Sequence, residues 1–116
     1  MEKDTMSSQL MYKPLPNSLT IATSNINGLG LFAKEGIAQD TNLGMSHIKF
    51  DGTIFRTPLG GFINHSNMEN CTKVELLMTN EDNPNIKFNY KKWNLVTLRD
   101  IKKGEELTVR YTFYNV

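Results

Sequence analysis

Three short segments of this chain hold the side chains best suited to chemistry. Asn64-His65-Ser66 follows the apolar pair Phe62-Ile63, so its polar atoms are expected to be partly buried and hydrogen-bonded. Tyr111 stands toward the end of an alternating segment, and a tyrosine hydroxyl in a partly dry channel can orient an amine. Gly28-Leu29-Gly30 allows close approach of a bulky neighbour, because glycine has no Cβ atom. The chemistry these residues suggest is the binding and orientation of a ligand.

Each segment also has a simpler structural interpretation. Asn64-His65-Ser66 could be a turn in which polar side chains cap backbone groups. The neighbour of Gly28-Leu29-Gly30 could be another strand as well as a cofactor, and the aromatic cluster that begins at Tyr111 could be packing. Glu105-Glu106 lies in a charged turn, which is typical of solvated side chains.

The sequence offers little for a metal site or a thiol nucleophile. Cys71 is the one cysteine, so no intramolecular disulfide can form, and a lone cysteine is typical of a small buried hydrophobe. A catalytic thiol would need His47 or His65 as its base. No second histidine stands at ligand spacing from His65, so no metal is predicted.

The composition is that of an ordinary globular domain. The chain has 116 residues, 39% of them hydrophobic, and a net charge of +1, which gives no electrostatic case for nucleic-acid binding. No apolar stretch approaches the roughly 20 residues that span a bilayer. The N-terminal residues lack the apolar region of a secretory signal, so the cytoplasm is the expected compartment.

Short β-rich runs separated by turn residues predict a mostly β domain at residues 18–116, preceded by a flexible arm at residues 1–17. No window sustains a helical period. An Asp51-Gly52 turn is expected after the third strand, and 57–61 is rich in residues that break strands. The expected strands cover 19–22, 29–37, 42–50, 73–79, 85–90, 93–98 and 107–113.

Three blocks together resemble the SET domain of protein-lysine methyltransferases, in the correct order. They are Gly28-Leu29-Gly30-Leu31-Phe32-Ala33, then Phe62-Ile63-Asn64-His65-Ser66 with Asn70-Cys71, and then the segment from Leu98 through Gly104-Glu105-Glu106-Leu107 to Tyr111. The resemblance covers about Ser18 to the end of the chain, and its last block is the most specific.

The resemblance implies a β-clip fold of several small sheets with a threaded, pseudoknot-like C-terminal segment. It implies S-adenosylmethionine as cofactor and Tyr111 as the catalytic residue. Asn64 and His65 would anchor the cofactor, Leu29 and Gly30 would meet its methionine part, and Phe113 would wall the site. The full implied cofactor set is Gly28, Leu29, Gly30, Asn64, His65, Tyr111 and Phe113.

Two departures from the family pattern concern the channel for the substrate lysine. Family members carry a Tyr-x-Gly where this chain has Gly44-Met45-Ser46-His47-Ile48. His47 would then either replace the missing tyrosine in the channel or lie on the surface. Val109 stands where some members place the aromatic residue that tunes the number of methyl groups added.

The implied function is methyl transfer from S-adenosylmethionine to a lysine amine of a protein or peptide. The alternatives are a non-catalytic binding module with the same fold and a small β-rich assembly protein. Similarity to compact viral and bacterial members places the protein in the host cytoplasm or nucleus if it is viral. A homodimer is a further expectation, because so small a domain would gain a complete groove from a partner; neither nucleic acid nor membrane is expected as a partner.

Overall fold

A computed structural model describes residues 15–79 and 89–111, which form short strands and one helical turn. In chain order the elements are β1 (Leu19–Thr23), β2 (Leu29–Ala33), β3 (Asn42–Phe50), β4 (Thr53–Arg56), α2 (Pro58–Gly61), β5 (Asn64–His65), β6 (Cys71–Met78), β7 (Tyr90–Thr97) and β8 (Glu106–Val109). The predicted mostly β fold is confirmed. No helix among these described residues is long and apolar enough to cross a membrane.

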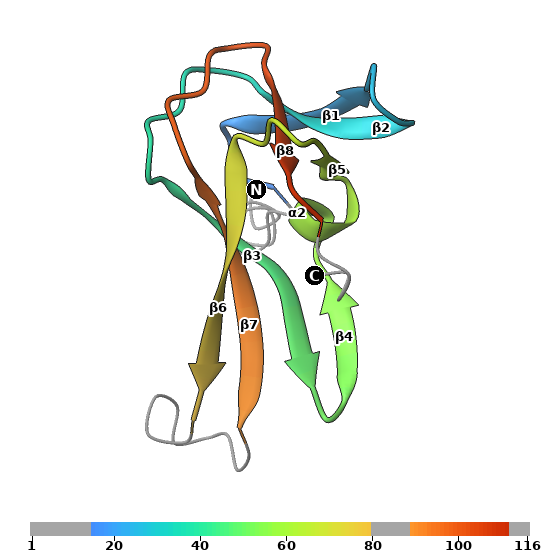
Figure 1. The fold of residues 1–116 in the computed structure, drawn as a ribbon, viewed down its shortest axis with the longest axis vertical. Coiled ribbons are helices and arrows are strands. Elements are labelled where there is room, and N and C mark those ends of the chain that lie inside the picture. Colours follow the sequence, from blue (N-terminus) through green and yellow to red (C-terminus); the bar gives the residue numbers. More distant parts are fainter. Residues whose placement is uncertain (1–14, 80–88, 112–116) are drawn as a thin grey trace, which may run out of the picture.

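The strands form two small sheets. One has the order β1-β2-β8-β5 and the other the order β4-β3-β7-β6. The second sheet extends from the first as a long arm of antiparallel strands (Figure 1). In the first sheet β5 pairs in parallel with β8, which brings Asn64-His65 beside Thr108 and Val109. The threading of the C-terminal segment stays a prediction, since 112–116 lie outside the described residues.

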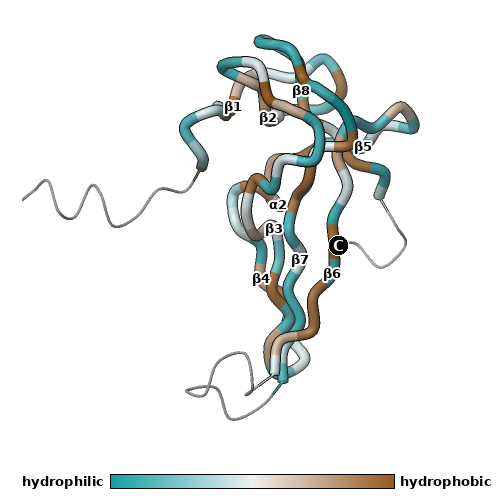
Figure 2. The backbone as a smooth tube through the Cα atoms, turned by 90° about the vertical axis from the view of Figure 1, so that its left-hand side faces the viewer, coloured by the Kyte–Doolittle hydropathy of each residue, from teal (hydrophilic) through white to brown (hydrophobic). Residues whose placement is uncertain are grey.

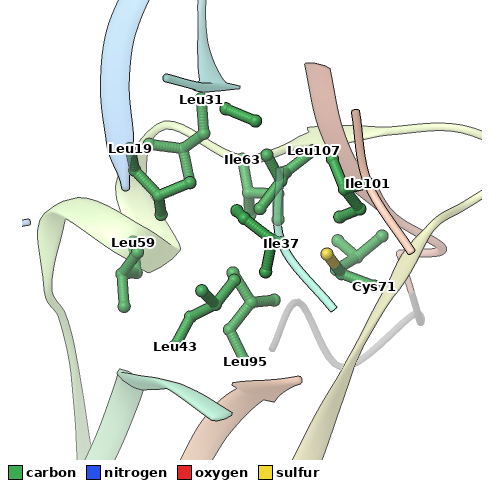
Figure 3. Close-up of a cluster of buried hydrophobic side chains, with 12 residues drawn as sticks. Leu19, Leu31, Ile37, Leu43, Leu59, Ile63, Cys71, Leu95, Ile101 and Leu107 are labelled. Atoms are coloured by element: carbon green, nitrogen blue, oxygen red, sulfur yellow. The ribbon is translucent and has the colours of Figure 1, made fainter. Parts of the chain in front are cut away.

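The hydrophobic core lies where the two sheets meet. Leu31 and Leu107 enter it from the first sheet and Leu95 from the second, and each is 0% exposed (Figure 3). Burying one such side chain stabilises the fold by about 1.5–3 kcal/mol. Cys71 packs in the same cluster, and burial raises the pKa of its thiol to about 12. This cysteine is therefore an inert core residue, as its isolation in the sequence predicted.

The sequence predicts only part of the hairpin from β3 to β4. The strand at Asn42–Phe50 has the predicted bounds, and the Asp51-Gly52 turn is confirmed by positive φ angles of 51° and 77°. The following strand, Thr53–Arg56, was not predicted. All four of its residues are exposed, so it lacks the alternating buried pattern by which a strand is recognised.

Three predicted elements differ in extent. The strand expected over 29–37 ends at Ala33, and Ile37 joins the fold through an isolated bridge to Ile101. The breaker-rich segment forms the helical turn α2, which Pro58 can begin because a proline at the first position loses no helical hydrogen bond. The strand expected over 85–90 falls mostly outside the described residues.

The last strand is shorter than predicted. It ends at Val109, so Tyr111 follows it rather than belonging to it. Thr108, on the face of the strand opposite Leu107 and Val109, is buried as well. The amide of Asn70 donates to the backbone oxygen of Glu106 at 2.8 Å, and its Oδ1 accepts from the Thr108 N–H at 2.8 Å.

Edge strand β6 carries apolar side chains on the surface. Val74, Leu76 and Leu77 are 42%, 39% and 57% exposed. Figure 2 shows this hydrophobic stretch along the part of β6 that is farthest from the first sheet. Edge strands also present unpaired backbone groups to other polypeptides.

The turn before β8 should give the fold a measurable acid sensitivity. The hydrogen bonds from Arg99 chiefly, and also the Lys102 N–H at 3.0 Å, lower the pKa of Glu105 from 4.5 to about 2. A lowered carboxyl pKa stabilises the fold above pH 4.5, and this contribution is lost as the pH falls toward 2. Because the pair is partly exposed, we expect Glu105→Gln to lower the free energy of unfolding at pH 7 by about 1 kcal/mol.

Urea denaturation at pH 7 and at pH 3 checks this expectation. The difference between wild type and Glu105→Gln should shrink at pH 3. Glu75→Gln is a matched control, because its ion pair with Lys91 is longer, at 3.7 Å, and more exposed. A Glu105→Gln variant as stable as wild type at pH 7 would contradict the role assigned to the pair.

Candidate active site

Asn64 holds three segments of the chain together at one end of the first sheet. Its Nδ2 lies within hydrogen-bonding distance of Ser24 Oγ at 3.1 Å, of the Asn27 and Leu29 backbone oxygens at 3.1 and 3.3 Å, and of Glu106 Oε2 at 2.9 Å. The glycine-containing loop between β1 and β2 is thus fixed against β5 and β8. The sequence blocks around Gly28 and Asn64 lie together, as the resemblance implied.

The carboxylate of Glu106 accepts hydrogen bonds within this cluster. The prediction that this side chain is solvated was wrong. Pairing of β2 with β8 sets it opposite Phe32, where its carboxylate accepts from Ser24 Oγ at 2.8 and 2.9 Å and from Asn64. A Cβ atom on Gly30 would collide with this carboxylate. Glu106 of strand β8 is therefore a close neighbour of Gly30, and contact of Gly30 with a cofactor stays a prediction.

His65 joins β5 to the segment that follows β8. Its Nδ1 accepts the backbone N–H of Tyr111 at 2.8 Å, so the ring proton is on Nε2, which donates to Asn67 Oδ1 at 3.2 Å. The His65 and Tyr111 rings also pack together, with centroids 5.1 Å apart. The histidine side chain therefore positions Tyr111.

Tyr111 is fixed at its other end as well. Its hydroxyl donates to the backbone oxygen of Ile63 at 2.7 Å, although the residue as a whole is 51% exposed. The Asn64-His65 block and the tyrosine thus lie side by side. Phe113, the remaining residue of the implied cofactor set, lies outside the described residues.

Tyr111 lines a small cavity together with side chains of the second sheet. The cavity has a volume of about 160 Å³ and is lined by His47, Arg56, Gly60, Ile63, Lys73 and Tyr111. A larger cavity of about 560 Å³ lies along β3 and β4, from Leu43 to Leu59, and contains none of the predicted site residues. The smaller cavity is the one that brings reactive side chains together.

His47 is a buried wall of this cavity, not a surface residue. It is 2% exposed, its Nδ1 lies 3.0 Å from Ser46 Oγ, and its ring meets Trp93 edge-on. Burial, with smaller contributions from the charges of Lys73 and Arg56, lowers its pKa from 6.5 to about 4. The imidazole is therefore neutral at physiological pH.

Val109 lies elsewhere. It is 1% exposed, belongs to the hydrophobic core cluster and is not among the described residues that line the cavity. Its tuning role in a substrate channel stays a prediction.

The cavity is lined by two positively charged side chains that were not predicted from the sequence to belong to the site, Arg56 and Lys73. Arg56 falls on the unpredicted strand β4, and Lys73 has no local pattern that distinguishes it from other strand lysines.

Comparison with known proteins agrees with this geometry. The sequence model of the SET domain matches residues 44–112, which is more than half of the chain. The chain therefore belongs to the SET-domain family. No curated protein sequence matches significantly.

Among solved structures, the fold is similar to the crystal structure of a candidate histone methyltransferase from Plasmodium falciparum. The TM-score is 0.63 over 85% of this chain and 96% of that one, at 17% sequence identity. At this identity the likeness establishes the fold.

Proposed function

We propose that this protein transfers a methyl group from S-adenosylmethionine to the side-chain amine of a lysine in a protein or peptide. The observation that carries the proposal is the placement of Tyr111. The hydroxyl of Tyr111 donates to the backbone oxygen of Ile63 at 2.7 Å, and the tyrosine lines the cavity of about 160 Å³. Tyr111 also lies beside Asn64-His65. A cavity of about 150 Å³ admits a benzene molecule, so the four-carbon arm of a lysine is of a suitable size.

The residues around Asn64 fit the cofactor that the family implies. Asn64 is only 7% exposed, yet no group in the described residues donates a hydrogen bond to its Oδ1 atom. The ammonium group of S-adenosylmethionine is a donor of the required kind. Asn64, the backbone of Leu29 and Gly30, and His65 would hold the cofactor, which supplies a methyl group on a positively charged sulfur.

The chain's own contribution is to present a neutral amine in line with that methyl group. A lysine has an ordinary pKa near 10.4 and must lose its proton before it can attack. The charges of Arg56 and Lys73 disfavour an ammonium ion there. Tyr111 and the backbone oxygen of Ile63 would orient the amine. Alignment of this kind can supply roughly 7–11 kcal/mol of the reduction in barrier.

His47 should shape the channel without exchanging protons. With a pKa of about 4 it stays neutral between pH 6 and 9, so the rise of the methylation rate with pH should show no step from this residue. We expect His47→Ala to lower kcat/KM for a lysine peptide about tenfold, because one wall of the cavity is lost. Steady-state kinetics from pH 6 to 9, with cofactor affinity measured in parallel, check this. Wild-type kinetics in the variant would remove His47 from the channel.

Calorimetric titration with S-adenosylmethionine tests the cofactor part of the proposal. Binding of one molecule per chain, followed by formation of S-adenosylhomocysteine when a lysine peptide is added, is the expected result. A folded protein that shows no heat at millimolar cofactor contradicts the proposal.

A non-catalytic binding module is the second candidate. The exposed apolar side chains of β6, which could contact a protein partner, favour it. Cofactor binding without any release of S-adenosylhomocysteine, in the presence of a broad set of lysine peptides, would distinguish this function from the enzyme.

A further inference from the structure

One lysine of the chain itself lines the cavity of Tyr111. Lys73 is on β6, is half-buried, and places its Nζ 5.8 Å from the centroid of the Tyr111 ring. The other polar side chains of the cavity are His47 from β3 and Arg56 from β4. None of the described lining residues is acidic. The site thus contains an amine of the chemical type that a lysine methyltransferase takes as substrate.

Lys73 also has the electronic properties of an acceptor. Desolvation by burial lowers the pKa of its amine, so more of it is neutral at a given pH than for an exposed lysine. Arg56 offers a guanidinium, which is a different chemical group from the amine of lysine. Among the described residues that line the cavity, Lys73 alone offers a primary amine.

We propose that Lys73 is an internal methyl acceptor, so that the protein methylates itself at this position. The inference rests on the proposed function. The ammonium of Lys73 first gives a proton to water. Its nitrogen lone pair then forms the N–C bond while the bond between methyl carbon and sulfonium sulfur breaks, and the electron pair stays on sulfur. The products are a methylated Lys73 ammonium and S-adenosylhomocysteine.

Self-methylation would change how the cavity admits a substrate. The methylated amine keeps its positive charge and becomes larger. Because Lys73 lies over the Tyr111 ring, the added methyl group would narrow the space in which an incoming lysine is oriented. The modified protein is therefore expected to methylate peptides more slowly than the unmodified one.

The test is tandem mass spectrometry of the purified protein after incubation with S-adenosylmethionine and a set of lysine peptides. We expect at least tenfold more methylation at Lys73 than at Lys34, a strand-flanking exposed lysine that serves as the control. The rate per molecule should not change with protein concentration, since the acceptor belongs to the same chain. Lys73→Arg, with folding checked by thermal melting, should abolish the signal.

The outcomes separate this inference from the proposed function. Methylated peptides with unmodified Lys73 would overturn self-methylation and leave the enzyme intact, whereas no transfer to any lysine would overturn both. A second readout needs no cofactor: trace acetylation across a pH series should show that the pKa of Lys73 is lowered from the ordinary lysine value. An ordinary pKa for Lys73 would contradict its acceptor role.

Discussion

Replacing Tyr111 with phenylalanine should lower the rate of methyl transfer about 100-fold while changing the affinity for S-adenosylmethionine less than twofold. The substitution removes one hydroxyl, which the backbone oxygen of Ile63 holds at 2.7 Å at the edge of the cavity. Loss of a positioning hydrogen bond in an active site costs about this much in rate. The aromatic ring remains, so its packing on His65 and the fold should be retained.

Single-turnover kinetics with a lysine peptide and calorimetry with the cofactor measure the two effects separately. Tyr90→Phe is the matched control, because this tyrosine lies on β7 next to Phe50 and away from the cavity. If Tyr111→Phe transfers methyl groups as fast as wild type, the tyrosine hydroxyl takes no part in the reaction.

Asn64→Ala should weaken both the fold and the cofactor site. The substitution leaves the carboxylate of Glu106 without its amide partner and releases the Leu29 backbone oxygen. Losing a hydrogen bond to a charged group in a partly buried place costs about 2–3 kcal/mol in the free energy of unfolding. Affinity for S-adenosylmethionine should fall at least tenfold, since an anchoring oxygen is removed and the loop around Gly28 is no longer held.

Urea denaturation gives the first quantity and calorimetry on the folded variant gives the second. Asn67→Ala serves as the control, because that exposed amide contacts the His65 ring but does not hold the glycine loop. If Asn64→Ala keeps both the stability and the cofactor affinity of the wild type, Asn64 anchors neither the glycine loop nor the cofactor.

The sequence predicted which residues would meet, because their identities and order carry the family pattern. Asn64-His65 and Tyr111 lie side by side as expected, through the parallel pairing of β5 with β8 and the hydrogen bond from Tyr111 to His65. Strand β3 and the Asp51-Gly52 turn were also predictable. A nine-residue β-rich run followed by Asp-Gly is a strong local signal.

The remaining features depend on contacts between distant segments. The local sequence around Glu106 is typical of a solvated turn. Its hydrogen bond with Ser24 depends on the pairing of β2 with β8, which the local sequence does not show. The hydrogen bond from the Thr108 N–H to Asn70 likewise joins residues that lie far apart in the sequence. Lys73 and Arg56 reach one cavity from opposite edge strands of the second sheet, and no local pattern of the sequence shows that convergence.

The most direct test of lysine methylation by this protein is to follow deuterated methyl groups from S-adenosylmethionine into lysine peptides by mass spectrometry. The prediction is a methyl-lysine product that forms together with an equal amount of S-adenosylhomocysteine, and a rate that falls about 100-fold in Tyr111→Phe. A folded protein that binds the cofactor yet transfers no methyl group to any lysine would contradict the proposed methyltransferase activity. The non-catalytic binding module would then be the remaining function.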